Sequence, residues 1–139
     1  MAYAIALVFG AVGAGLWIAG VRWIGRGEPW WFALGLVVAA AIYLTHGLGV
    51  EPPPELGVAF AGVGLFVVIG VGGAARWSWL LGAGWALHAV WDVAAPRVAD
   101  LSYMPAWYAP ACLGFDLVVA TYLLSRPTRP ASTDQLVGP

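Results

Sequence analysis

The chain has 139 residues, of which 62% are hydrophobic and 9% are charged, and its formal net charge is −1. Soluble domains carry roughly 25% charged residues, and a fold of this size has too little interior to bury so much apolar surface. The composition therefore excludes an ordinary soluble protein, the near-neutral charge argues against a nucleic-acid partner, and the absence of lysine excludes a retinal Schiff base.

Five apolar runs, separated by short polar or breaker-rich joints, predict an all-α membrane protein with five transmembrane helices. A hydrocarbon core about 30 Å thick needs about 20 residues per helix, so five spans nearly exhaust the chain. The first run lacks the positively charged start of a signal peptide, and we read it as a span. The predicted spans cover residues 2–21, 30–49, 56–74, 77–95 and 105–124, within one domain of residues 1–125.

Glycine, proline and charged residues set the predicted boundaries. Gly25, Gly27 and Pro29 separate the first two spans, and the sequence EPPPE at residues 51–55 ends the second span. Pro96 is expected to stop the fourth span. Residues 126–139 contain three prolines and no apolar period, so we expect a flexible cytoplasmic tail.

The arginines predict the orientation in the membrane. With the N-terminus outside, the outer side holds only Arg97. The inner side then holds the other five arginines: Arg22, Arg26, Arg76, Arg126 and Arg129. The positive-inside rule therefore predicts a multi-pass protein of the cell membrane with its N-terminus outside and its C-terminus inside.

Small residues on the first span predict close helix packing. They recur at i, i+4 spacing on two adjacent faces, Ala6–Gly10–Ala14 and Ala11–Gly15–Ala19. Such faces let a second backbone approach closely, and they fit another helix of this chain, a second copy or a larger membrane complex.

Four ionisable residues lie inside the predicted spans: His46, His88, Asp92 and Asp116. An acid at a helix centre costs roughly 2.5 to 3.5 kcal/mol on insertion scales, and such residues usually face the bundle interior and serve function. His88 and Asp92 share one stripe of the fourth span, because residues four apart lie on one helix face. Asp116 lies on a comparable stripe of the fifth span.

These residues suggest proton-transfer chemistry. We expect Asp92 to hydrogen-bond His88 and to fix the tautomer of its ring. Asp116 has no arginine at its depth, which favours its neutral form. We therefore predict His88, Asp92 and Asp116 as catalytic residues, with His88 as general acid or base, Asp92 as its positioning partner and Asp116 as a second acid.

Neighbouring aromatic and polar side chains complete the predicted site. In the second span they share a face, and in the fifth span they share the stripe of Asp116. The predicted ligand-binding residues are Tyr43, His46, Trp85, Trp91, Tyr108 and Cys112. Cys112 is the only cysteine, so no disulfide and no Cys-x-x-Cys metal motif is expected within the chain.

One sequence pattern resembles a known group of proteins. His88-Ala-Val-Trp-Asp92, followed by Met104-Pro-Ala-Trp-Tyr108, Cys112 and Asp116, resembles a pattern in small bacterial multi-span membrane proteins of no known function. The resemblance covers the last two predicted spans and their connector, and it implies a bacterial membrane protein without implying an activity.

The predicted site is also similar to that of membrane-embedded sterol isomerases, which combine a His-x-x-x-acid helix with another buried acid. In those enzymes the acids are mainly glutamates, and their other helices do not align with this chain. The similarity is compatible with proton transfer on an apolar substrate.

Three functional hypotheses follow from the sequence. The first is a site in the outer half of the bilayer that binds an apolar small molecule or performs proton transfer on it. The second is a metal or haem site that uses His46 and His88 with Asp92, Asp116 and Cys112. The third is a scaffold subunit or an oligomeric transporter, in which the His–Asp pair only holds helices in register.

Overall fold

The computed structural model describes residues 1–50, 56–98 and 103–126, and in these residues the chain is helical with no strand. The predicted all-α class is therefore confirmed for this part of the chain. The helices are α1 (Ala2–Ile24), α2 (Glu28–Gly47), α3 (Gly57–Ala75), α4 (Ser78–Val98) and α5 (Tyr108–Leu124). The EPPPE joint, residues 99–102 and residues 127–139 of the predicted tail lie outside the described residues.

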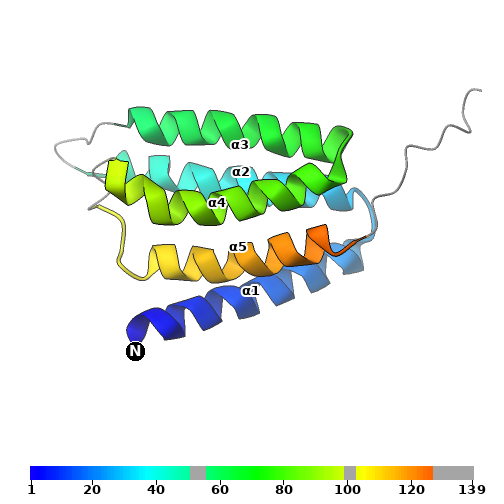
Figure 1. The fold of residues 1–139 in the computed structure, drawn as a ribbon, viewed down its shortest axis with the longest axis horizontal. Coiled ribbons are helices and arrows are strands. Elements are labelled where there is room, and N and C mark those ends of the chain that lie inside the picture. Colours follow the sequence, from blue (N-terminus) through cyan, green and yellow to red (C-terminus); the bar gives the residue numbers. More distant parts are fainter. Residues whose placement is uncertain (51–55, 99–102, 127–139) are drawn as a thin grey trace, which may run out of the picture.

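The helices form an elongated antiparallel bundle (Figure 1). In this view α3 lies along one edge, α2 and α4 occupy the middle, and α5 and then α1 follow toward the opposite edge. Helix α1 packs mainly against α5, α2 against α3, and α4 against both α5 and α3. Helix α1 makes little contact with α2, and this leaves the bundle loosely closed between them.

Three helices, α1, α2 and α3, are long and apolar enough to cross a membrane by length and composition. Helix α5 is also apolar but has 17 residues, and α4 carries both His88 and Asp92. Large apolar side chains point outward along the bundle, including Phe9, Leu16 and Val68, each more than two-thirds exposed. The expected multi-span character is thus supported for three helices, while the number of five spans stays a prediction.

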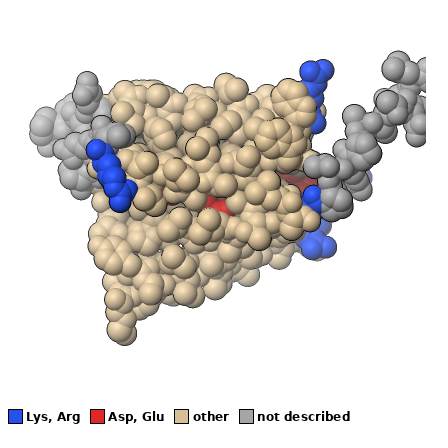
Figure 2. Space-filling model, viewed as in Figure 1, with Lys and Arg blue, Asp and Glu red and all other residues tan. Residues whose placement is uncertain are grey.

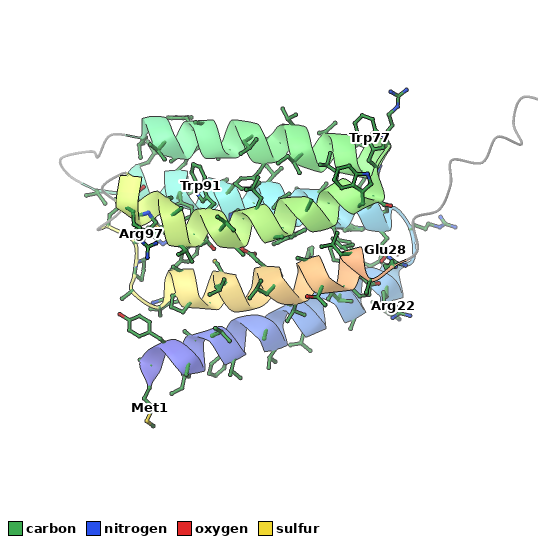
Figure 3. The ribbon with its side chains drawn as sticks, in the orientation of Figure 1. Met1, Arg22, Glu28, Trp77, Trp91 and Arg97 are labelled. Atoms are coloured by element: carbon green, nitrogen blue, oxygen red, sulfur yellow. The ribbon has the colours of Figure 1, made fainter. Side chains whose placement is uncertain are left out.

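The described arginines lie at the two ends of the bundle (Figure 2). Arg22 lies near the end of α1, beside Glu28, and Arg97 lies at the opposite end (Figure 3). Between the ends, the surface in this view is almost free of charged side chains. The predicted orientation depends on this placement of the arginines at the two ends of the bundle. The orientation itself stays a prediction.

The turn between α1 and α2 requires glycine at two positions. Gly25 has φ 68° and Gly27 has φ 66°, both in the left-handed region that favours glycine. Gly25 ends α1 in this conformation, and its N–H donates to the carbonyl of Val21. Helix α2 begins directly after this turn, at Glu28, which is two residues earlier than predicted.

The prolines of α4 and α5 lie near the ends of their helices. Pro96 was expected to stop the fourth helix, yet α4 continues through it to Val98. A proline near a helix C-terminus removes one backbone bond, while the residues after it can keep helical dihedrals. Pro110 lies in the first turn of α5, which begins at Tyr108 rather than at residue 105. Backbone N–H groups in a first turn have no intrahelical acceptor, so proline is tolerated there.

Helices α1 and α5 approach at glycine contacts. A Cβ added at Gly10 would lie 1.8 Å from the carbonyl oxygen of Ala111, and one added at Gly114 would lie 2.1 Å from that of Leu7. Ala6 and Ala14, on the same face of α1 as Gly10, are buried. One of the two predicted small-residue faces therefore packs against α5, whereas a Cβ at Gly15, on the other face, would meet nothing within 4 Å.

We expect Gly10→Ala and Gly114→Ala each to destabilise the protein by about 1–3 kcal/mol, because each new methyl group would push two backbones apart. The matched control is Gly15→Ala, which should be neutral or slightly stabilising because alanine has a higher helix propensity than glycine. Thermal unfolding of the purified protein in detergent, followed by circular dichroism, measures the difference. Equal melting temperatures for Gly10→Ala and Gly15→Ala would contradict the α1–α5 contact.

Candidate functional site

Four polar side chains from three helices meet inside the apolar bundle. They are Tyr43 of α2, His88 and Asp92 of α4, and Asp116 of α5, and each is at most 2% exposed. We call them the His–Asp cluster. Helix α4 contributes two members because residues 88 and 92 are one turn apart on its buried face. The two predicted stripes, on α4 and α5, therefore face each other.

The hydrogen bonds of the cluster join different helices. Nδ1 of His88 lies 2.8 Å from Oδ2 of Asp116, within hydrogen-bond distance. The same nitrogen is 3.6 Å from Oδ2 of Asp92. The hydroxyl of Tyr43 donates to Oδ1 of Asp92 over 2.7 Å. The structure thus differs from the expected His88–Asp92 bond, since Asp116 orients the imidazole and Tyr43 holds Asp92.

This geometry lets a proton move between a base and an acid. Either the ring N–H of His88 donates to the carboxylate of Asp116, or a protonated Asp116 donates to the ring. Both forms use the same short contact, and the surrounding apolar side chains strengthen it by excluding water. The arrangement is that of an acid–base pair whose proton has two binding positions.

Two atoms of the cluster are buried and have no hydrogen-bond partner among the described residues. They are Nε2 of His88 and Oδ2 of Asp92. The His88 ring packs beside Phe66 of α3, with ring centroids 4.9 Å apart. Buried polar atoms are usually hydrogen-bonded, and exceptions in natural proteins often mark functional sites. The cluster therefore has capacity to bind more than its own members.

An apolar groove leads to the cluster from one side of the bundle. It has a volume of about 390 Å³ and runs between α1, α2 and α5, and Trp85 of α4 also borders it. Its walls are almost entirely apolar, and its lining residues with polar atoms in their side chains include Tyr108, Cys112 and Asp116. We call it the α2–α5 groove. Because α1 and α2 scarcely touch, this groove opens sideways rather than toward an end of the bundle.

A second groove borders the cluster through Asp92. It has a volume of about 620 Å³, is formed by α1, α4 and α5, and has Arg97 among its walls. We call it the α4–α5 groove. A small acidic spot is visible in the middle of this face (Figure 2), where the described acids of α4 and α5 are Asp92 and Asp116. Arg97 itself donates to the backbone carbonyl of Val93.

Four of the predicted ligand-binding residues lie at the cluster or the α2–α5 groove. Tyr43 belongs to the cluster, and Trp85, Tyr108 and Cys112 border the groove. Tyr108 also packs edge-on against Tyr43, with ring centroids 5.6 Å apart. Its hydroxyl donates to the carbonyl of Ala39 over 3.3 Å, and this contact joins α5 to α2.

The other two predicted residues lie elsewhere. His46 is exposed, and its ring Nδ1 lies 3.1 Å from the carbonyl of Ile42 in the preceding turn. It lies near the end of α2, where its ring packs against Tyr108 with ring centroids 6.3 Å apart, and it borders neither groove. Trp91 points toward α3 (Figure 3), where its ring would contact any Cβ placed at Gly62. It packs against Phe66 and does not border either groove.

The sequence interpretation did not identify three residues of this region. Phe66 contacts His88, and Trp17 and Gly35 border the α2–α5 groove. The apolar sequence of α3 gave no signal for Phe66, because no polar residue marks the buried face of that helix. Gly35 shares a helix face with Tyr43, and its spacing in the sequence placed it on that face, although it was not predicted to bind the ligand. Trp17 had none, since the neighbours of α1 were unknown.

No protein-family model, curated protein or solved structure matches the chain. The resemblance to small bacterial membrane proteins therefore stays a prediction.

We expect Tyr43→Phe to destabilise the protein by about 1–3 kcal/mol, because it leaves the buried carboxyl group of Asp92 without its donor. Tyr122→Phe is the matched control. It also removes a hydroxyl that donates to a carboxylate, that of Glu28, but Glu28 keeps its contact with Arg126. The control should lose less than about 1 kcal/mol. Thermal unfolding in detergent compares the two, and an equal loss would contradict the buried Tyr43–Asp92 bond.

Proposed function

We propose that the chain is a five-span membrane protein, with its N-terminus outside and its C-terminus inside. Three helices have the length and hydropathy of membrane spans. Because the bundle is antiparallel, α4 and α5 lie alongside them and would cross the same thickness of the bilayer. The outward-facing apolar side chains and the arginines at the ends support this arrangement. The His–Asp cluster then lies in the hydrophobic region, with His88 and Asp116 at the middle of α4 and α5 and Asp92 one turn nearer the outside.

We propose further that the protein binds an apolar small molecule from the bilayer and that the His–Asp cluster exchanges a proton with it. One observation carries this proposal. Asp116 both contacts buried His88 at 2.8 Å and borders an apolar groove that opens sideways. A molecule dissolved in lipid would reach Asp116 without crossing water, and the groove volume of about 390 Å³ falls in the range of small-molecule pockets.

Each member of the cluster has a proposed role. Asp116 is the acid that meets the bound molecule, and His88 supplies or accepts the proton of Asp116. Tyr43 and Asp92 are positioning residues, because Tyr43 holds Asp92 beside the imidazole. The charge of a protonated His88 would be balanced by the two carboxyl groups near its Nδ1.

The proposal predicts that filling the α2–α5 groove abolishes binding of an apolar probe. Trifluoromethyl-tetralin, an apolar fused-ring compound, should give a protein-bound signal in fluorine NMR with the wild-type protein in detergent. Gly35→Leu should remove this signal, because the new side chain would occupy the space beside Trp85 and Trp17.

Gly64→Leu is the matched control, since a Cβ at Gly64 meets nothing within 4 Å. It should bind the probe as the wild type does. Val38→Trp, which blocks the groove from an exposed position on its wall, gives a second test if Gly35→Leu unfolds. A bound signal that survives both blocking substitutions would overturn the proposed binding groove.

A divalent cation is a second candidate ligand of the same cluster. One ligand atom from each of His88, Asp92 and Asp116 lies within 4.8 Å of the others, and all three residues are buried. Oδ2 of Asp92 is unpartnered and faces the imidazole. Two carboxylates and an imidazole form a donor set that suits Zn²⁺, and the cation would neutralise both buried charges. His46 lies outside the cluster, so the geometry does not favour haem with two histidine ligands.

Metal analysis separates the two candidates. If the cluster is a metal site, wild-type protein dialysed against Zn²⁺ and then against buffer should retain about one equivalent. His88→Gln and Asp92→Asn should each lose most of that metal, while His46→Gln should retain it. Equal zinc content in all four proteins would exclude the cluster as the site.

A further inference from the structure

We infer that the ligand of the α2–α5 groove is a neutral molecule with a planar ring and a carbonyl oxygen, a chemical class that includes cyclic ketones and quinones. This inference rests on the proposed function, because it assigns the chemistry of the molecule that occupies the same groove. It depends on two tryptophans that the proposed proton transfer does not use.

Two indole N–H groups of the groove lack an acceptor. Trp17 of α1 and Trp85 of α4 both border the groove. Nε1 of each is buried and has no hydrogen-bond partner among the described residues, and Trp85 as a whole is 1% exposed. An indole nitrogen can only donate, and a buried indole usually finds an acceptor. The missing partner is therefore an acceptor atom, and a ligand in the groove is the available source.

Gly35 brings the two indoles together. A Cβ placed at Gly35 would lie 3.2 Å from Cζ2 of Trp85 and 3.5 Å from Cζ2 of Trp17. Both six-membered rings therefore approach α2 at the same glycine, and the absence of a side chain at Gly35 leaves room for them. A carbonyl oxygen has two lone pairs and can accept hydrogen bonds from indole N–H groups.

The other polar groups of the groove disfavour a charged ligand. Among the described residues, no lysine or arginine borders the groove, so an anion would lack a counter-charge there. Asp116, the acid among the described lining residues, is already paired with His88. The hydroxyl of Tyr108 is engaged with Ala39. A neutral ligand with an acceptor satisfies the indoles without breaking these contacts.

Aromatic side chains form much of the groove wall and favour a flat ring. Trp85 packs against Phe115 with ring centroids 5.5 Å apart, and Trp17 and Trp107 are further aromatic members of the wall. Aromatic rings prefer stacked or edge-on contacts with other planar rings. A planar carbonyl compound would make these contacts while its oxygen meets the two indoles.

Two matched probes test the inference. Trifluoromethyl-tetralin and trifluoromethyl-tetralone share their fused rings, and only the tetralone has a carbonyl oxygen. Fluorine NMR titration of the wild-type protein should give the tetralone about a tenfold lower Kd, after correction for partition into the micelle. Trp17→Phe and Trp85→Phe should each weaken tetralone binding about threefold or more beyond any change in tetralin binding, so that the preference for tetralone falls.

Trp23→Phe is the control, because Trp23 is 90% exposed and lies outside the groove; it should change neither affinity. If an indole variant fails to fold, proton–nitrogen NMR of the wild type replaces it. The side-chain N–H signals of Trp17 and Trp85 should then shift with tetralone more than with tetralin.

The outcomes separate this inference from the proposed function. Equal affinity of the wild type for both probes would overturn the carbonyl class and leave the binding groove intact. A preference for tetralone that persists in both Trp17→Phe and Trp85→Phe would overturn the role of the indoles. Failure of both probes to bind would overturn the proposed function together with the inference.

Discussion

The contact between His88 and Asp116 governs the interior of this bundle. It links α4 to α5 at 2.8 Å in surroundings that otherwise contain almost only apolar side chains. Removing either partner would leave a buried polar group without compensation, which is far more costly here than at a surface. The bond between Tyr43 and Asp92 extends the same constraint to α2. Three helices are therefore fixed in rotation about their axes by two polar contacts, whereas apolar packing alone tolerates such rotation more readily.

Helix α1 has a different relation to the bundle. Its glycine contacts hold it against α5, and it scarcely touches α2. The backbone approach at Gly10 and Gly114 is what allows α1 to lie close to α5 and still leave the α2–α5 groove beside it. The groove is thus a consequence of uneven packing: α1 is tightly held on one side and open on the other.

The helices and the burial of His88, Asp92 and Asp116 could be predicted from the sequence, because apolar run length and residue spacing report helical faces directly. The pairing within the cluster could not. The spacing of four residues favours a hydrogen bond between His88 and Asp92. In the structure, α5 packs close enough to α4 that Asp116 lies nearer to the imidazole than Asp92 does. The positions of His46 and Trp91 could not be predicted for the same reason. The sequence shows which residues share a helix face, but it does not show which helix packs against that face. The place of Trp17 in the groove wall could not be predicted either, because it depends on how α1 packs against α5.

The position of the cluster between the two grooves has a consequence for sidedness around the bundle. Asp116 borders the α2–α5 groove and Asp92 borders the α4–α5 groove, and both carboxyl groups approach Nδ1 of His88. The cluster therefore lies between the two grooves and presents a different acid to each of them. In the proposed function, a proton would move between Asp92 and Asp116 through Nδ1 of His88, while molecules in the two grooves stay apart.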